Sequence, residues 1–305
     1  MHVFLTGGTG FVGSYVLRAL LNAGHTARCL VRTPGASLVE RSARVETVLG
    51  DVTHPDALTR AVEGCDAIIH LVGILDEQPT RGVTFEAVHV TGTIHAVQAA
   101  QNAGIDRFIH MSANGAHPDA DTEYLTTKWR AEQVVKDAGF DHWTIFRPSL
   151  VFGDPGLDHP EFASKLTRQL VRPFPILPVF GDGSYRMQPI AVEAVTEAFV
   201  QALTREAAHG RIFCAAGRDA ITYTTVLNRI TRALGAPRKP KFFLPLWLAR
   251  PLVQVLGPIG LVPITPHQLE MLVAGNTCDP SAFFDTFDVQ SVPFTPEHLS
   301  YLRHS

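Results

Sequence analysis

The sequence predicts an α/β fold with a doubly wound parallel sheet, because three patterns coincide in its first half. Short apolar segments alternate with longer segments whose apolar residues recur at helical spacing. A glycine-rich turn, residues 7–13, joins the first apolar segment to the first helical one. Two of the helical segments end directly before a glycine, at Gly24 and Gly104. Strands that alternate with helices form parallel sheets with right-handed crossovers and helices on both faces.

Each element of this sheet is expected from its local pattern. The first helix repeats Val12, Val16 and Leu20 along one side, and the strand 66–72 is mostly apolar. We expect strands at 2–6, 25–31, 45–49, 66–72, 107–111 and 143–146. We expect helices at 11–23, 55–62, 84–103 and 123–138.

The second half of the chain has a different organisation. After Arg147-Pro148 the alternation stops, prolines become frequent, and short helical patterns remain at 161–170, 191–204 and 224–234. We therefore expect a first domain over residues 1–150 and a smaller C-terminal α+β substrate lobe over residues 151–305. The helix at 191–204 leaves this boundary open, because it is also compatible with a return to the first domain.

Composition and charge exclude several classes of protein. A chain of 305 residues, 46% of them hydrophobic, builds a large buried core. A net charge of -3 with 18% charged residues argues against a nucleic-acid partner. No basic leader precedes the first strand, and no run of about 20 residues lacks charges and helix breakers. We therefore expect a cytoplasmic protein without a transmembrane segment.

The cysteines and histidines indicate no metal site. The chain has four cysteines, at Cys29, Cys65, Cys214 and Cys278. None belongs to a CxxC motif or has a histidine at zinc-ligand spacing, so we interpret them as buried small residues in a reducing compartment. Four histidines lie in or beside apolar segments, namely His70, His89, His95 and His110. They also lack ligand spacing, and we interpret them as histidines of the core or the cleft.

The glycine-rich turn predicts a Rossmann-type dinucleotide-binding site. Gly7, Gly10 and Gly13 follow a strand and open a helix. The first glycine accommodates unusual backbone angles, the second lets the backbone approach a pyrophosphate, and the third lets the helix pack tightly on the strand. The phosphates then face the N–H groups and the positive end of the helix. The expected contact residues of this turn are Gly7, Thr9, Gly10, Phe11, Val12 and Gly13.

The residues after the second and third strands predict the kind of nucleotide. NAD-binding domains usually carry an acidic residue at the end of the second strand, where it binds the ribose hydroxyls. Here that strand is followed by Arg32, whose guanidinium suits a 2′-phosphate. We therefore expect NADP(H), with NAD(H) as the alternative cofactor. After the third strand we expect Asp51 and Val52 beside the adenine, although Asp51 is also placed to cap the helix near Thr53.

Tyr124 and Lys128 are the predicted catalytic pair. They lie four residues apart on a predicted helix, so their side chains share one face. An ammonium group at that distance favours the phenolate and lowers the tyrosine pKa from about 10. Such a tyrosine passes a proton to or from a carbonyl or hydroxyl beside the nicotinamide, while Lys128 also holds the ribose. Ser112 follows the strand 107–111 at the carboxyl edge of the sheet, where it would orient the substrate oxygen.

Together these motifs resemble the extended and atypical short-chain dehydrogenase/reductase superfamily, which is epimerase/dehydratase-like. The motifs that carry the resemblance are residues 6–13, 50–51, 112, 124–128 and 147–153. Residues 181–192 and 265–272 are similar to the branch with the nucleotide-binding accessory subunit of respiratory complex I and its bacterial relatives. The resemblance implies a Rossmann domain, a C-terminal substrate lobe and bound NADP(H). It also implies cofactor contacts from Leu71, Val72, Gly73, Arg147 and Pro148.

Two departures from the superfamily pattern affect residue roles. Many extended members carry an asparagine in the long helix, where this chain has His89. The proton-relay water that such an asparagine supports is therefore not transferred to this chain. Many members also read Val-x-Asp-Val after a Gln-Pro motif, where this chain has residues 192–195, Val-Glu-Ala-Val. The usual acidic contact is not transferred either.

The stretch 242–262 is the most apolar part of the chain, and three interpretations of it remain open. It forms the core of the C-terminal lobe, or the apolar wall of a site for a lipid-like substrate, or a surface for a membrane or protein partner. Its prolines and Arg250 argue against a spanning helix.

Three functions fit these motifs. The first is an NADP(H)-dependent oxidoreductase that acts on a carbonyl or hydroxyl of a small apolar substrate, with Tyr124, Lys128 and Ser112 as catalytic residues. The second is a non-catalytic NADP(H)-binding subunit or redox sensor that resembles the complex I subunit. The third is a nucleotide-sugar epimerase or dehydratase, which the apolar C-terminal lobe favours least.

Overall fold

The computed structural model describes residues 1–305 except 35–41, 157–158, 160, 258–263 and 305. The chain divides into two compact units. The first contains residues 1–148, 193–215 and 281–289, and the second contains residues 149–192, 216–280 and 290–305. The second unit is therefore not one continuous segment from residue 151 to the end, because residues 193–215 and 281–289 belong with the first.

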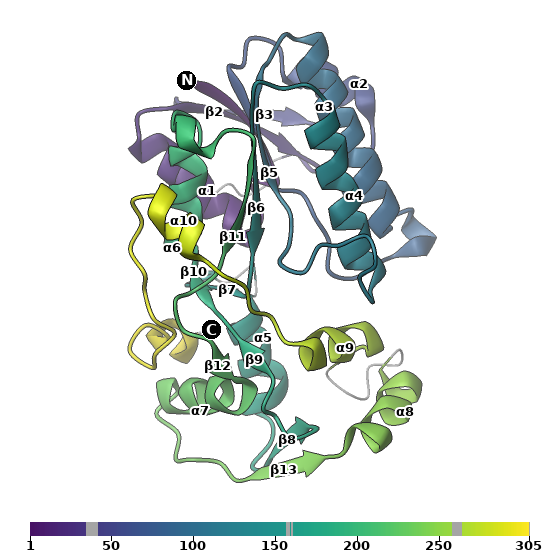
Figure 1. Ribbon diagram of the computed structural model, residues 1–305, viewed down its shortest axis with the longest axis vertical. Coiled ribbons are helices and arrows are strands. Elements are labelled where there is room, and N and C mark those ends of the chain that lie inside the picture. The colour runs from purple at the N-terminus through teal and green to yellow at the C-terminus, as the bar shows by residue number, and fades with distance from the viewer. Residues whose placement is uncertain (35–41, 157–158, 160, 258–263, 305) are drawn as a thin grey trace. The chain divides into compact units, whose positions relative to one another are not determined.

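A seven-stranded parallel sheet forms the centre of the first unit (Figure 1). Its order is β11-β6-β5-β4-β1-β2-β3. The strands are β1 His2–Thr6, β2 Thr26–Val31, β3 Val45–Leu49, β4 Ala67–His70, β5 Arg107–Met111, β6 His142–Pro148 and β11 Arg211–Ala215. The chain adds β2 and β3 on one side of β1 and returns to add β4 on the other, so the topological switch lies between β1 and β4. The predicted doubly wound α/β fold is confirmed.

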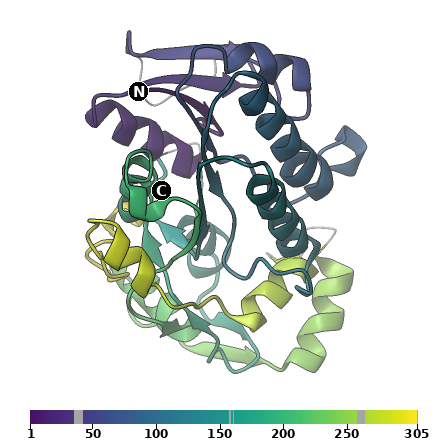
Figure 2. The same ribbon diagram turned by 45° about the horizontal axis from the view of Figure 1, so that its top comes forward.

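Helices cover both faces of this sheet, as two views of the ribbon show (Figures 1 and 2). One face carries α2 Pro55–Ala61, α3 Gly92–Asn102 and α4 Glu123–Asp137. The other carries α1 Phe11–Asn22, α6 Val192–Gln201 and α10 Ser281–Thr286. Shorter helical turns occur at Pro79–Arg81, Glu86–Thr91 and Glu206–Ala208. The expected helix 84–103 therefore consists of a π-helical turn, Glu86–Thr91, followed by α3.

Strand alternation divides the core of the first unit into two layers. On β6, Ile145 packs with Phe108 and Val135 in the layer beneath α2, α3 and α4. Its neighbour Phe146 faces the other way, and its ring centroid lies 4.4 Å from that of Phe199 on α6. Phe213, Phe283 and Phe287 complete this aromatic layer. The β11 strand and α10 close the layer, although the sequence pattern predicts neither.

The second unit is an α+β assembly of short strands and helices. Its strand pairs are β7 Val151–Phe152 with β10 Ile190–Ala191, β8 Leu177–Phe180 with β13 Lys241–Leu244, and β9 Arg186–Met187 with β12 Ile221–Thr222. Its helices are α5 Phe162–Leu166, a π-helical turn Thr167–Val171, α7 Tyr223–Ala233, α8 Leu246–Leu256, α9 Pro266–Ala274 and the 3-10 turn Ser300–Arg303. Phe152, Leu177, Leu227 and Ile230 belong to its main core.

The apolar stretch 242–262 is only partly core. Ala249 and Val253 are fully buried, but Phe242, Trp247 and Val255 are exposed by 60%, 77% and 68%. Interpretation of this stretch as the core of the lobe is therefore wrong for most of its large side chains. Residues 258–262 lie outside the described part of the chain.

The remaining sequence expectations have mixed outcomes. Cys29 and Cys65 are buried free thiols, as expected, and burial raises the pKa of Cys29 to about 12 and that of Cys65 to about 11. Cys214 and Cys278 are disulfide-bonded, so the expectation of free thiols is wrong for these two. Within the described residues, no helix is long and apolar enough to cross a membrane, and no group of three or more His, Cys, Asp or Glu side chains is arranged to hold a metal ion.

Candidate functional site

The glycine-rich turn after β1 allows α1 to start in direct contact with it. Gly7 has φ +78°, a backbone conformation that side chains disfavour. The Gly10 N–H donates to the Gly7 carbonyl over 2.9 Å. A Cβ atom on Gly13 would lie only 2.0 Å from the same Gly7 oxygen. The third glycine is thus required for close packing, which is the role that the sequence pattern predicts.

The start of α1 offers unpaired backbone donors. Gly10 is its N-cap and provides no side-chain cap, and the first turn contains no acidic residue. The first N–H groups of a helix have no partners within the helix, so those of Phe11 and Val12 are available to an anion. The positive end of the helix dipole adds to this attraction. The turn and the helix start therefore fit a pyrophosphate.

The switch point of the sheet brings a second turn against the first. A Cβ atom on Gly7 would lie 3.2 to 3.3 Å from the backbone and Cβ of Leu71 and the backbone nitrogen of Val72. These two residues follow β4, and Gly73 comes next in the chain. Residues 7–13 and 71–73 thus lie together at the carboxyl edge of the sheet, where open α/β sheets bind their ligands, and we call this place the crevice.

The two residues expected at the adenosine end have different surroundings. Arg32 follows β2, is exposed, and has no hydrogen-bonding or ionic partner among the described residues. The Asp51 Oδ1 accepts hydrogen bonds from the Thr53 N–H over 2.9 Å and from the Thr53 hydroxyl over 2.8 Å. The N-cap of α2 is His54, so Asp51 stabilises the turn before the helix rather than capping it.

Val52 supports the crevice from below. Its side chain is buried, and a Cβ atom on Gly92 would lie 2.9 Å from it. Its carbonyl oxygen lies 2.9 Å from the His95 Nδ1. Val52 therefore links the end of β3 to α3 through close packing and one hydrogen bond.

Lys128 lies in the crevice beside the second turn. A Cβ atom on Gly73 would lie 2.9 Å from the Lys128 Nζ and 3.6 Å from the His89 Nε2. The ammonium donates to the Met111 carbonyl at the end of β5 over 3.1 Å, and the side chain is only 2% exposed. Burial lowers the pKa of Lys128 to about 8, and the Glu132 carboxylate opposes this shift. Gly73, which has no side chain, thus leaves room beside the buried ammonium of Lys128.

Glu132, one helical turn after Lys128, forms a partly buried ion pair with Arg147. The Arg147 Nε and Nη2 donate to the two Glu132 carboxylate oxygens over 2.7 and 2.6 Å. The Glu132 side chain is fully buried, whereas that of Arg147 is 27% exposed. The Arg147 guanidinium thus neutralises Glu132. The cofactor contact that the sequence resemblance implies for Arg147 stays a prediction. Pro148 ends β6 beside it, at the same edge of the sheet.

Tyr124 lies one helical turn before Lys128, with its ring against two aromatic side chains. Its centroid lies 5.5 Å from that of His89 and 5.8 Å from that of Phe85, each in an edge-to-face arrangement. Burial raises the pKa of Tyr124 to about 12. The expectation that Lys128 lowers this pKa is therefore wrong for the protein alone, because desolvation of the phenolate dominates. The phenol is protonated and can donate.

Ser112 lies directly after β5 with an unused hydroxyl. Its side chain is 3% exposed, and its Oγ has no hydrogen-bond partner among the described residues. Its backbone N–H donates to the Phe146 carbonyl over 2.7 Å, which fixes the residue to β6. Buried hydroxyls normally have partners, so this one is suited to accept or donate a hydrogen bond to a ligand.

His89 occupies the π-helical turn that precedes α3. The Ile74 N–H donates to its Nε2 over 3.1 Å, so its proton is on Nδ1, 3.0 Å from the Thr127 hydroxyl. That hydroxyl in turn donates to the Glu123 carbonyl over 2.7 Å. Burial, reinforced by the charge of Lys128, lowers the pKa of His89 to about 3. The neutral ring therefore connects the turn after β4 to α4, and π-helical turns often occur at functional sites.

Two further histidines lie in the sheet below the crevice. His70 is fully buried, with its Nδ1 2.9 Å from the Thr6 hydroxyl and its Nε2 3.3 Å from that of Thr93. His110 stacks on it with ring centroids 5.5 Å apart, and burial lowers its pKa well below its usual value. Neither nitrogen of His110 has a partner among the described residues. Both histidines are therefore buried and neutral.

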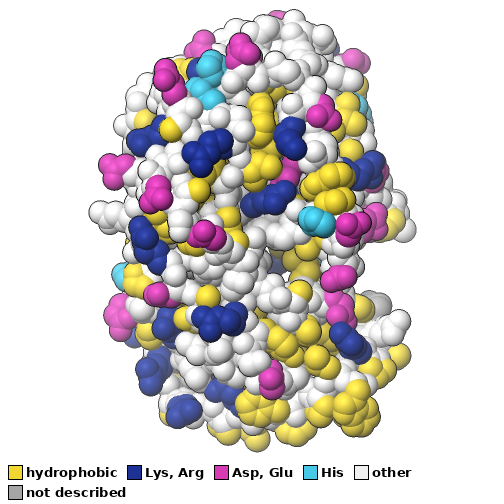
Figure 3. Space-filling model, viewed as in Figure 1, with side chains coloured by type: hydrophobic (Ala, Val, Ile, Leu, Met, Phe, Trp, Pro, Cys, Tyr) yellow, Lys and Arg dark blue, Asp and Glu magenta, His cyan; other side chains and the backbone are white. Residues whose placement is uncertain are grey.

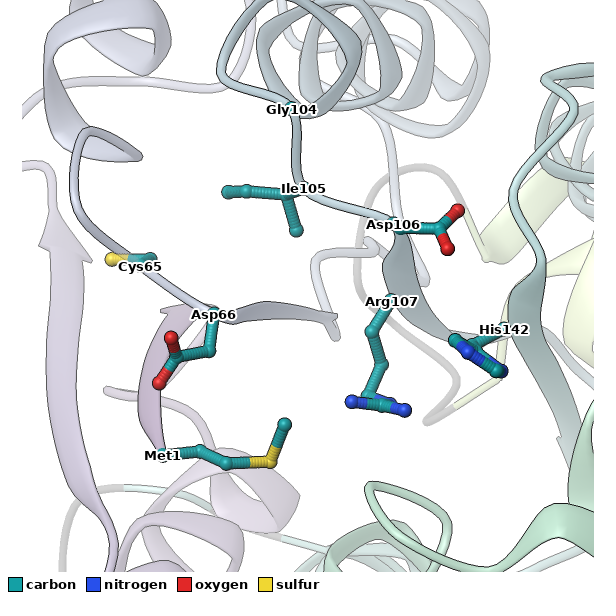
Figure 4. A pocket seen from close by; sticks show the side chains of 8 residues that line it. All are labelled: Met1, Cys65, Asp66, Gly104, Ile105, Asp106, Arg107 and His142. Atoms are coloured by element: carbon teal, nitrogen blue, oxygen red, sulfur yellow. The ribbon is translucent and has the colours of Figure 1, made fainter.

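A separate pocket lies at the opposite, amino-terminal edge of the sheet (Figure 4). The side chains of Asp66, Arg107 and His142 point into it from the starts of β4, β5 and β6, and Met1 closes one side. None of the predicted site residues lines this pocket. Nucleotides bind at the carboxyl edge of such sheets, so this pocket is not the candidate site.

Comparisons with known proteins agree with this geometry. A model described as the NAD dependent epimerase/dehydratase family matches residues 3–216. Ceramide reductase of Caulobacter vibrioides is 32% identical over 240 residues, 78% of this chain and 72% of that protein. The mitochondrial NADH-ubiquinone oxidoreductase 40 kDa subunit of Neurospora crassa is 27% identical over 285 residues, 90% of this chain and 72% of that protein. The structure of MoeE5 in complex with UDP-glucuronic acid and NAD has a TM-score of 0.76 and 17% identity, and covers 100% of this chain and 99% of that chain.

Proposed function

Since the chain belongs to the NAD dependent epimerase/dehydratase family, we propose that it is an NADP(H)-dependent oxidoreductase acting on a carbonyl or hydroxyl of a small apolar molecule. The family resemblance expected from the sequence is confirmed by the match over residues 3–216. The proposal rests mainly on one observation. The buried Lys128 shares the helix α4 with Tyr124. Its ammonium lies beside Gly73, in the crevice next to the glycine-rich turn.

The nicotinamide nucleotide would supply the hydride, and the residues of this chain would bind, orient and move a proton. Residues 7–13 and 71–73 would hold the nucleotide. The Tyr124 phenol, protonated because its pKa is raised to about 12, would donate its proton to the carbonyl oxygen during reduction. The unpaired Ser112 hydroxyl would donate a hydrogen bond to the same oxygen. Lys128 would hold the ribose and stabilise the phenolate that forms.

The preference for NADP(H) follows from the end of β2. Arg32 is exposed and unpaired among the described residues, and no acidic residue stands beside it in the sequence. A guanidinium binds a 2′-phosphate with two hydrogen bonds, whereas the carboxylate usual in NAD-binding domains would repel it. The Asp51 Oδ2 would remain for the adenine, because the hydrogen bonds of Asp51 to Thr53 both use Oδ1.

The substrate class is proposed from the relatives and from the second unit. The relative from Caulobacter vibrioides is named for the reduction of ceramide, which is a lipid. The second unit is α+β and supplies many large apolar side chains, both buried and exposed. An apolar alcohol, ketone or aldehyde is therefore the substrate class that we favour over a nucleotide sugar.

A turnover assay with a matched variant tests the proposal. NADPH oxidation is measured against long-chain ketones, aldehydes and quinones for the wild type, Tyr124→Phe and Tyr185→Phe. We expect Tyr124→Phe to lose about 10²- to 10⁴-fold in kcat while NADPH affinity stays unchanged. Tyr185→Phe, the same change in the second unit, should keep its activity. Equal rates for both variants would contradict the role of Tyr124.

The second candidate is an NADP(H)-binding subunit or sensor without turnover. It is favoured by the match to the 40 kDa complex I subunit, which extends over 90% of this chain. Tight NADPH binding in calorimetry, with no oxidation in the presence of any substrate tested, would support this candidate over the enzyme.

A further inference from the structure

Exposed large hydrophobic side chains cluster in one part of the second unit. Eleven of them are exposed in the described chain, and eight of these lie in two segments, 174–176 and 242–255. The eight residues, which we call the apolar face, are Phe174, Ile176, Phe242, Phe243, Trp247, Leu248, Leu252 and Val255. Figure 3 shows hydrophobic side chains concentrated in the region of β8, β13 and α8. Single exposed hydrophobic residues are normal, but a contiguous group indicates an interaction surface.

Local structure explains why these side chains lie together. β8 and β13 pair in parallel, and the Leu177 N–H donates to the Pro240 carbonyl over 2.9 Å. Segment 174–176 is thereby placed beside the start of β13. Pro245 then ends the strand and begins α8. The strand pairing therefore places the two segments side by side.

The helix α8 is apolar on both its buried and its exposed side. Ala249 and Val253, four residues apart, are buried against the unit. Trp247, Leu248 and Val255 project from the other side and are exposed by 77%, 43% and 68%. A helix of 11 residues is about 16 Å long, half of the roughly 30 Å of a bilayer core. It is suited to lie along a membrane interface rather than to cross it.

Positively charged residues are frequent in the part of the chain that carries this apolar face. Residues 220–269 contain six lysines and arginines and no aspartate or glutamate, in a chain with a net charge of -3. The Lys239 ammonium lies 2.8 Å from the Phe174 carbonyl, directly beside the apolar face. Lys241 immediately precedes Phe242, and Arg238 is exposed. Arg250 is neutralised by Glu270, and Arg229 interacts with the Glu297 carboxylate, but the other four cations form no ion pair among the described residues.

We propose that the apolar face, with its rim of cations, docks on a membrane surface that contains anionic lipid. The aromatic and aliphatic side chains enter the interface, where tryptophan is favoured, and the lysines and arginines contact the headgroups. A neutral protein partner or a second copy of this chain would not require the excess of positive charge. The proposal does not depend on nucleotide binding, because none of these residues lies in the crevice of the first unit.

Vesicle sedimentation tests the proposal with the full chain. The probes are vesicles of phosphatidylcholine alone and of phosphatidylcholine with an equal part of phosphatidylglycerol. We expect the protein to sediment with the anionic vesicles, and to lose at least tenfold in partitioning when salt is raised to about 1 M. Recovery of the protein in the supernatant with both kinds of vesicle would overturn the proposal.

Two variants distinguish membrane binding through this apolar face from nonspecific hydrophobic association. Trp247→Ser/Leu248→Ser removes two exposed side chains of α8, and we expect at least a tenfold loss of partitioning onto anionic vesicles. Leu49→Ser/Leu75→Ser removes two side chains of similar exposure, 57% and 52%, from the first unit, and should bind as the wild type does. Both variants should keep the thermal midpoint of the wild type. Equal losses in the two variants would refute docking through α8.

A charge variant and a spectroscopic readout complete the test. Arg238→Glu changes an exposed rim cation, and we expect several-fold weaker binding to anionic vesicles only. Trp247 is the most exposed large hydrophobic residue, so its fluorescence should shift to shorter wavelength on anionic vesicles. A wild-type dimer in light scattering, lost in Trp247→Ser/Leu248→Ser and accompanied by no vesicle binding, would assign the face to a second copy instead.

Discussion

The nucleotide crevice of the first unit and the apolar face of the second violate the usual distribution of side chains in opposite ways. The crevice buries groups that prefer water, including an ammonium at Lys128, an unpaired hydroxyl at Ser112 and a neutral imidazole at His89. The apolar face exposes groups that avoid water, with Trp247 as the extreme. Buried polar groups and exposed apolar patches are the informative exceptions in a folded protein.

The difference indicates two kinds of function. A desolvated charge or hydroxyl costs stability, and it is useful where a ligand brings the missing partner. An exposed apolar surface costs solubility, and it is useful where a partner covers it. Under our two proposals, the first unit would act on a small molecule, and the second would contact an extended surface.

The largest expected effect comes from Lys128→Met, which removes the buried charge and keeps the volume. We expect kcat to fall by about 10²- to 10⁴-fold, because the tyrosine loses its cationic neighbour. We also expect the free energy of unfolding at pH 7 to rise by about 1 to 3 kcal/mol, since the folded protein holds this ammonium against a pKa lowered to about 8. Urea unfolding and turnover assays measure the two effects.

The sign of the pH dependence sharpens this prediction. Between the folded pKa of about 8 and the ordinary value of 10.5, the unfolded chain binds more protons at Lys128 than the folded chain does. Stability of the wild type should therefore rise with pH across that window, relative to Lys128→Met. Lys136→Met, an exposed change on the same helix, serves as the control. A variant less stable than the wild type at pH 7, with the same pH slope, would show that Lys128 is not destabilising.

Glu132→Gln tests the ion pair behind the crevice. Glu132 is fully buried and binds Arg147 with two hydrogen bonds, so loss of its charge should cost about 3 kcal/mol of unfolding free energy. It should also lower the pKa of Lys128 further, because Glu132 raises it. The exposed pair of Glu86 with Arg130 gives the matched control, and Glu86→Gln should cost less than about 1 kcal/mol. Similar losses of unfolding free energy in both variants would mean that burial adds little to the contribution of the ion pair to stability.

Arg32→Ala tests the cofactor preference. We expect NADPH affinity to fall about tenfold while NADH affinity stays unchanged, because only NADPH presents a 2′-phosphate. Dissociation constants from calorimetry measure both. Arg60→Ala, an exposed arginine on α2, should leave both affinities as they are. If NADPH and NADH bind equally to the wild type, Arg32 does not select the nucleotide.

The smallest expected effect is that of Trp247→Ser on folding. The side chain is 77% exposed, so the free energy of unfolding should change by less than about 0.5 kcal/mol. Leu177→Ala, a fully buried change in the same unit, should cost about 2 to 5 kcal/mol. Thermal or urea unfolding compares the two. A large loss in Trp247→Ser would place Trp247 in the core and remove the basis of the apolar face.

Several features were determined by the sequence alone. The spacing of Gly7, Gly10 and Gly13 predicts the tight start of α1, because the steric need for glycine is local. The order of apolar segments predicts six of the seven strands of the sheet. The four-residue spacing of Tyr124 and Lys128 predicts one helical face, since α4 contains both.

Other features were decided only by tertiary structure, because they depend on what lies around a side chain. Spacing places Tyr124 near Lys128, but the pKa of the phenol rises because desolvation exceeds the attraction of the lysine. The partner of Arg147 is Glu132, fifteen residues earlier, and no local pattern indicates that pairing. An apolar stretch such as 242–255 has the same periodicity whether it is buried or exposed. Only the packing of β8, β13 and α8 determines which of its side chains meet the solvent.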